Sequence, residues 1–150
     1  MSDALRRRVP SAAPVYRSLK ALTLLLGAVI VVLSLIPNPP GGAGGGAIGA
    51  WLSRLLFGTD AYADKAAHLL AYTALSGTAL LAFGRHRWQA AGVLVALLAL
   101  GAVLELGQAA GGVRTGDMLD MAANAAGVML GTGIGAALRL GVRALGLSPR

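Results

Sequence analysis

Four long apolar segments without charged residues constrain the fold of this chain more than any other feature. The first is ALTLLLGAVIVVLSLI, residues 21–36, and the others run from Ala66 to Gly84, from Trp88 to Leu104 and from Met121 to Leu138. Each holds about 16 to 19 residues, close to the roughly 20 that an α-helix needs to cross a bilayer. We therefore predict an all-α, polytopic membrane protein that forms a four-transmembrane-helix bundle.

Composition agrees with that class of protein. Apolar residues make up 56% of the chain and charged residues 13%, whereas ordinary soluble domains carry about 25% charged residues. The chain has room for one membrane domain, residues 1–150, whose spans we place at about 20–36, 62–84, 88–108 and 117–138. Cysteine is absent, so the protein has neither disulfides nor a thiolate metal site.

The net charge of +7 could indicate nucleic acid as a partner, but the placement of the basic residues argues against it. They cluster beside the apolar segments, where Lys and Arg set topology and contact lipid headgroups. If the spans alternate, ten of the 13 basic residues lie on one side, and the other side receives Arg54, Lys65 and Arg114. We therefore predict a lipid bilayer as partner, no nucleic acid, and a multi-pass protein of the inner (cytoplasmic) membrane with both termini cytoplasmic.

The first span and the connection after it each have an alternative interpretation. The span could be a signal peptide cleaved at AIGA, although its apolar run is longer than the roughly 7 to 15 residues of a signal core. After it, the Pro- and Gly-rich PNPPGGAGGGA precedes a segment with apolar residues at helical spacing, opposite Ser53 and Arg54: Ile48, Trp51, Leu52, Leu55 and Leu56. This segment is either a short helix lying flat on the outer leaflet or a plain loop.

Polar residues of the last three spans gather on the predicted outer side, where helical periodicity puts them in stripes. The candidate polar site comprises Asp64, Lys65, His68 and Tyr72 on the second span, Glu105 and Gln108 on the third, and Arg114, Asp117, Asp120 and Asn124 at the fourth. The stripe on the second span continues to Ser76. The stripe on the fourth span continues as Gly127, Gly131 and Gly135, small residues that let another helix pack closely.

Two interpretations of these residues stay open. An ionisable group within a span costs on the order of 2.5 to 3.5 kcal/mol on insertion scales, so such groups usually face the bundle and have partners. A purely structural network of polar contacts, formed by Asn124, Gln108 and an ion pair such as Asp120 with Arg114, would provide those partners without any chemistry. The residues nearest the interface could also be charges that merely end a helix: Asp64, Lys65, Arg114 and Asp117.

At these residues the chain resembles the VanZ-like family of small bacterial integral membrane proteins. The matching pieces, in order, are SLIP, DKAAHLLAY, ELGQ and RTGDMLDMAANAAG. By this resemblance the motif residues would be Asp64, Lys65, His68, Tyr72, Glu105, Gln108, Arg114, Asp120, Asn124 and Gly127. The resemblance implies a protein of the cell envelope linked to tolerance of glycopeptide antibiotics such as teicoplanin, and it supplies no mechanism.

Three functions are compatible with the sequence. The polar site could bind an envelope precursor, a lipid or a glycopeptide, with Lys65 and Arg114 on its phosphate or carboxylate. It could instead be a hydrolase of a lipid-linked substrate at the outer leaflet, working by acid/base chemistry or with one divalent metal. The third is a transporter, or a structural or assembly protein without a site, built on the glycine stripe of the fourth span, and such a protein could be a homo-oligomer. The sequence leaves open whether the protein is an enzyme, and which cofactor or metal it would use.

Overall fold

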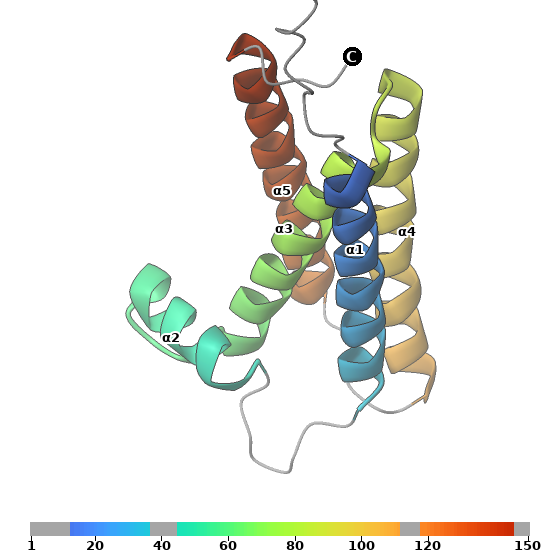
Figure 1. Cartoon of the computed structure of the whole chain (residues 1–150). Coiled ribbons are helices and arrows are strands. Elements are labelled where there is room, and N and C mark those ends of the chain that lie inside the picture. Colours follow the sequence, from blue (N-terminus) through green and yellow to red (C-terminus); the bar gives the residue numbers. More distant parts are fainter. Residues whose placement is uncertain (1–12, 37–44, 112–117, 146–150) are drawn as a thin grey trace, which may run out of the picture.

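The computed structural model describes residues 13–36, 45–111 and 118–145. Within these residues the chain is all-α and contains no strand. Its five helices are α1 (Ala13–Leu35), α2 (Gly46–Phe57), α3 (Ala63–Phe83), α4 (Arg87–Gly111) and α5 (Met118–Ala144). All except α2 are long and apolar enough to cross a membrane. α1 and α4 run in one direction and α3 and α5 in the other (Figure 1). The predicted all-α bundle is confirmed, with four helices that are long and apolar enough to cross a membrane.

The helices begin and end close to the predicted spans. α1 ends at Leu35. The next residue, Ile36, is followed by Pro37, and a residue before proline avoids the helical conformation. α1 begins earlier than expected, at Ala13, and α5 continues past residue 138 to Ala144. These extensions bring basic residues into the helix ends, where long Lys and Arg side chains can reach the membrane interface.

The most extensive helix contact in the bundle joins α3 to α5. Gly127, Gly131 and Gly135 are buried at this contact. A Cβ atom on Gly131 would stand 2.1 Å from the carbonyl oxygen of Thr73, and one on Gly127 would stand 2.5 Å from that of Leu69. No side chain fits at such distances, so glycine at these positions is what allows the two backbones to approach.

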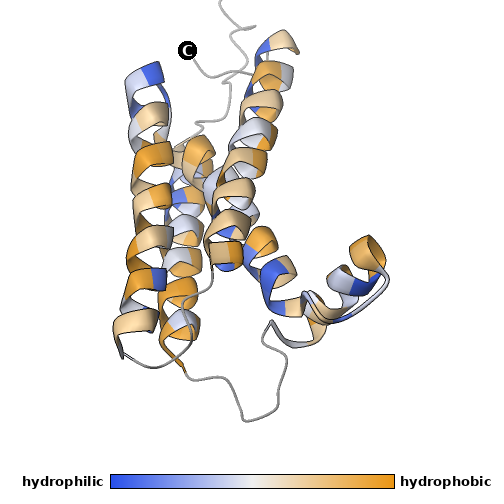
Figure 2. Cartoon of the chain, turned by 180° about the vertical axis from the view of Figure 1, so that it is seen from behind, coloured by the Kyte–Doolittle hydropathy of each residue, from blue (hydrophilic) through white to orange (hydrophobic). Residues whose placement is uncertain are grey.

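Large apolar side chains lie both inside the bundle and on its outer surface. The buried core consists of Ile30, Tyr72, Leu75, Leu104 and Val128. Hydrophobic residues also cover the outside of the long helices, as Figure 2 shows by colour, and many of them are more than half exposed. A surface of this kind suits lipid, which solvates apolar side chains as well as a protein core does.

α2 is a helix, so the loop interpretation of this segment is wrong. It lies beside the start of α3 and projects away from the bundle (Figure 1). Gly45 and Gly58 flank it in the left-handed conformation, with φ of 90° and 71°, which glycine adopts without strain. A Cβ atom on Gly49 would stand 2.2 Å from the carbonyl oxygen of Ala63. α2 therefore packs on α3 through small residues.

The side of α2 that faces away from α3 is apolar. Ile48, Trp51 and Leu55 are more than 60% exposed. Ser53 is buried and donates a hydrogen bond to the Thr59 carbonyl oxygen at 2.6 Å, so it does not share a solvent face with Arg54 as the sequence suggested. Arg54 instead forms an exposed ion pair with Asp60 at 2.6 Å, and its hydrogen bond holds the pKa of the Asp60 carboxyl below the ordinary value.

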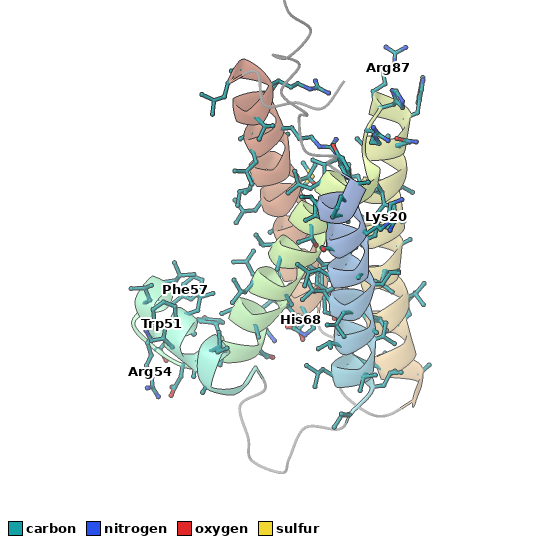
Figure 3. The ribbon with its side chains drawn as sticks, in the orientation of Figure 1. Lys20, Trp51, Arg54, Phe57, His68 and Arg87 are labelled. Carbon is teal, nitrogen blue, oxygen red and sulfur yellow. The ribbon has the colours of Figure 1, made fainter. Side chains whose placement is uncertain are left out.

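The end of the bundle farthest from α2 is basic. Figure 3 shows Lys20 and Arg87 at this end and His68 toward the opposite end. Arg139 of α5 donates hydrogen bonds to carbonyl oxygens in the last turn of α3, including that of Leu81 at 3.0 Å and that of Gly84. The last carbonyls of a helix lack intrahelical partners, so the guanidinium both satisfies them and complements the negative end of the helix dipole.

Candidate functional site

Polar side chains from three helices meet near the end of the bundle that carries α2. We call the set made up of Asp64, Lys65, His68, Glu105, Asp120 and Asn124 the polar cluster. Glu105, Asp120 and Asn124 are no more than 5% exposed, whereas Lys65 and His68 are half-buried. The cluster therefore has a buried floor on α4 and α5 and an accessible edge on α3.

Lys65 forms the ionic part of the polar cluster. Its ammonium nitrogen lies 2.8 Å from Asp64 Oδ2 and 2.9 Å from Asp120 Oδ1. Asp64 is in the first turn of α3 and Asp120 in the first turn of α5. A carboxylate in that position is stabilised by the helix dipole, so the ion pairs tie together two helix N-termini that each favour a negative charge.

Asn124 links His68 to Glu105. Its amide nitrogen donates to Glu105 Oε1 at 3.3 Å, and its amide oxygen lies 2.9 Å from His68 Nδ1. Since an amide oxygen can only accept, His68 Nδ1 must carry the proton in this hydrogen bond. In the neutral ring Nε2 then holds a lone pair. Among the described residues, none forms a hydrogen bond with Nε2.

Tyr72 lies beneath the polar cluster. The side chain is 1% exposed, and no described residue accepts or donates a hydrogen bond at its hydroxyl. A Cβ atom on Gly101 would stand 3.5 Å from Tyr72 Cε1 and 3.4 Å from Asn124 Nδ2, so the ring edge and the amide approach each other over this glycine. The sequence reasoning missed Gly101, although it lies one helical turn before Glu105 on the same face.

Two residues that the sequence grouped with the site belong to helix packing in the structure. Gln108 is buried and donates to the Ser34 carbonyl oxygen at 2.7 Å, which ties α4 to the end of α1. Ser76 is buried and donates to the Gly127 carbonyl oxygen at 3.3 Å across the α3–α5 contact. Both bonds join helices away from the accessible edge of the polar cluster. Two further candidate residues lie outside the described residues: Arg114 and Asp117.

Three residues of the polar cluster, one at its edge and two in its floor, have the composition of a metal site. His68, Glu105 and Asp120 each offer one ligand atom, and these three atoms lie within 4.8 Å of one another. They come from three different helices, so the bundle itself determines their spacing. Imidazole nitrogen with carboxylate oxygens is a donor set that divalent transition metals accept.

Comparison of the chain with protein families, curated proteins and solved structures gave no significant match.

Proposed function

We propose that the chain is a VanZ-like protein of the bacterial inner membrane, whose polar cluster faces outward and binds or acts on a lipid-linked or other cell-envelope molecule. The motifs SLIP, DKAAHLLAY, ELGQ and RTGDMLDMAANAAG carry the resemblance. The orientation follows from the basic residues at the end of the bundle opposite the polar cluster, which is the end expected in the cytoplasm. The first half of α1, the connection from α3 to α4 and the last turns of α5 meet at this end (Figure 1), and their described basic residues are Arg17, Lys20, Arg85, Arg87, Arg139 and Arg143.

One observation carries the proposal: the accessible edge of the polar cluster rests on a buried and hydrogen-bonded floor. Lys65 and His68 are half-buried, while Asp120 and Asn124, which contact them, are no more than 5% exposed. A purely structural network of polar contacts needs partners within the bundle but no accessible side. Functional side chains, in contrast, must be reachable and must be held in position by supporting contacts.

The edge offers two complementary groups to a ligand. Lys65 presents an ammonium, a point charge suited to phosphate, and His68 Nε2 presents a lone pair to a hydroxyl or amide hydrogen. A phosphorylated headgroup with neighbouring hydroxyl or amide groups would satisfy both. The apolar tail of the same molecule would lie in the bilayer against the outer surface of the helices. These requirements describe a lipid-linked envelope molecule.

α2 supports binding of such a molecule. We infer that the helix lies in the outer leaflet interface, with Trp51 and Phe57 among headgroups and acyl chains, because their side chains are 63% and 57% exposed and tryptophan is enriched at that level. Because α2 packs on the beginning of α3, the helix that carries Lys65 and His68 is anchored at the membrane surface. The accessible edge then lies at headgroup depth.

The link to glycopeptide tolerance is tested by expressing the protein in a teicoplanin-sensitive bacterium. We expect the intact chain to raise the inhibitory concentration of teicoplanin, and Lys65→Ala and His68→Ala to abolish the increase at an unchanged amount of membrane protein. Arg54→Ala and His86→Ala are the controls, since the first removes another positively charged side chain and the second another imidazole, both outside the polar cluster. Tolerance that persists in both cluster variants, or that falls only with protein amount, would exclude this role.

A further inference from the structure

We propose that His68, Glu105 and Asp120 bind one divalent transition-metal ion, of which Zn²⁺ is the best match, at the floor of the polar cluster. The three ligand atoms lie within 4.8 Å of one another, and the two carboxylate residues are 3% and 5% exposed. α3, α4 and α5 each contribute one of them. The inference rests on this geometry and is independent of the identity of any envelope molecule. With the ion bound, the His68 Nε2 lone pair would serve the metal, and a hydroxyl or amide group of such a molecule would meet the open coordination position of the ion instead.

The distances suit a small ion after a modest movement of the side chains. Zn²⁺ holds imidazole nitrogen and carboxylate oxygen at about 2.0 to 2.2 Å, so its tetrahedral ligand atoms lie roughly 3.4 Å apart. The widest pair among the three ligand atoms of His68, Glu105 and Asp120 is at most 4.8 Å apart. A closure of about 1.4 Å is therefore sufficient, which rotation of a carboxylate side chain provides.

Asn124 already supplies the contacts that orient metal ligands in proteins. Its amide oxygen accepts the His68 Nδ1 hydrogen, and its amide nitrogen donates to Glu105. A metal-binding histidine usually donates its other ring N–H to such a partner, which selects the tautomer and the ring orientation. In His68 the hydrogen bond to Asn124 favours the tautomer whose Nε2 lone pair is available, and a neutral imidazole of this kind is what binds a metal.

Tyr72 is an independent indication of a ligand at this position. Its side chain is 1% exposed, and its hydroxyl has no hydrogen-bond partner among the described residues. Tyr72 Cε1 and Asn124 Nδ2 both lie within 3.5 Å of the position that a Cβ atom on Gly101 would take, so the ring and the amide face the same glycine. A buried hydroxyl without a partner costs about 1 to 3 kcal/mol. A metal ion or a water bound to that ion would provide the missing partner.

Charge and ligand type both favour a transition metal over the alternatives. Two carboxylates and one neutral imidazole balance a 2+ ion, which matters in a span where a net charge is costly. Mg²⁺ and Ca²⁺ prefer all-oxygen sites, whereas imidazole suits zinc and its neighbours. Three protein ligands leave one coordination position for water or substrate, as in catalytic zinc sites.

Lys65 would share Asp120 with the metal ion. Its ammonium nitrogen lies 2.9 Å from Asp120 Oδ1 and forms an ion pair with this carboxylate. The contact is thus an ionic one that metal binding can weaken. Removal of the Lys65 charge is expected to maintain or strengthen metal binding, while it weakens binding of an anionic headgroup. This opposite response separates failure of the metal proposal from failure of the proposed function.

The test is Zn²⁺ binding by the full chain in lipid nanodiscs, after treatment with a chelator, measured by calorimetry and by metal analysis of the washed protein. We expect one Zn²⁺ per chain, with little competition from Mg²⁺. His68→Ala, Glu105→Gln and Asp120→Asn should each weaken binding by about 100-fold or more, and Tyr72→Phe by about 10-fold. Lys65→Ala should bind at least as tightly as the unmodified chain.

Controls keep the result interpretable. His86→Ala and Asp60→Asn remove residues of the same types outside the polar cluster, so both should bind Zn²⁺ normally. Glu105→Gln and Asp120→Asn preserve side-chain size and one acceptor oxygen, and thermal unfolding without metal verifies that they fold. The proposal is overturned if the folded protein binds no Zn²⁺, or if the three ligand variants bind it as tightly as His86→Ala does.

Discussion

The Asn124 amide nitrogen lies 3.3 Å from Glu105 Oε1 and donates to it the hydrogen bond that joins α5 to α4 inside the polar cluster. Both side chains are 3% exposed. A buried carboxylate depends on such donors, because burial without a hydrogen bond or a countercharge destabilises its ionised form. Asn124 thereby supports Glu105 and, through its amide oxygen, also determines which nitrogen of His68 carries the proton.

Replacement of Asn124 by leucine should therefore destabilise the bundle. The variant removes one partner from Glu105 and another from His68, so we expect unfolding to become easier by about 1 to 3 kcal/mol. This exceeds the average of about 0.6 kcal/mol for one interhelical hydrogen bond in a membrane. Thermal unfolding in mild detergent measures the difference.

Thr78→Ala is the control for that measurement. The Thr78 hydroxyl bonds to carbonyl oxygens of its own helix, those of Ala74 and Leu75, so its loss should leave helix association unchanged. If Asn124→Leu unfolds at the same temperature as Thr78→Ala, the bridge between His68 and Glu105 contributes nothing to the fold.

The α3–α5 contact predicts opposite outcomes for two glycines of one helix. A Cβ atom on Gly131 would stand 2.1 Å from the Thr73 carbonyl oxygen, whereas one on Gly133 would meet nothing within 4 Å. Gly131→Ala should separate α3 from α5 and lower both the folded yield and the unfolding temperature. Gly133→Ala should be neutral or slightly stabilising, because alanine favours the helix by up to about 1 kcal/mol over glycine. Equal behaviour of the two variants would mean that this contact is not formed in the membrane.

Single cysteines test the orientation that the proposed function requires. Ala61 is exposed at the end of the bundle near the polar cluster, and His86 is exposed at the basic end. In intact cells a membrane-impermeant thiol reagent should label Ala61→Cys and not His86→Cys, and permeabilisation should allow labelling of both. Gly45 is unsuitable for this purpose, because its φ of 90° and the Ala63 carbonyl oxygen exclude a side chain. Labelling of His86→Cys alone in intact cells would put the polar cluster on the cytoplasmic side.

The fold could be predicted from the sequence because each span is a long apolar run that only a helix can carry across lipid. Helical periodicity also predicted that Asp120 and Asn124 share a face, and the structure has both buried on the inner side of α5. The cost of an ionisable group in a span predicted partners for Asp120, Glu105 and His68 in the same way.

Other features depend on tertiary packing that the sequence pattern does not contain. Glu105 and Gln108 are one turn apart on one face of α4, and only the position of α4 between α1 and α5 directs Gln108 to Ser34 and Glu105 to Asn124. The ion-pair partners of Lys65 could not be predicted either, because its long side chain can contact several carboxylates. The sequence left α2 open between a helix and a loop, and its close contact with α3 at Gly49 is a tertiary feature that the pattern does not contain.

The central claim is that the accessible edge of the polar cluster binds a lipid-linked phosphate, and native mass spectrometry of the full chain tests it most directly. The probes are a polyprenyl phosphate and the uncharged polyprenol of equal length, each added to the chain and to Lys65→Ala and Arg54→Ala. A charge-assisted hydrogen bond contributes about 1.5 to 3 kcal/mol. We therefore predict that the chain prefers the phosphate, that Lys65→Ala loses about 10-fold or more in affinity for it, and that Arg54→Ala binds normally. Equal binding of phosphate and alcohol, or of phosphate by Lys65→Ala and the unmodified chain, would contradict the claim and leave the polar cluster as a structural element of the bundle.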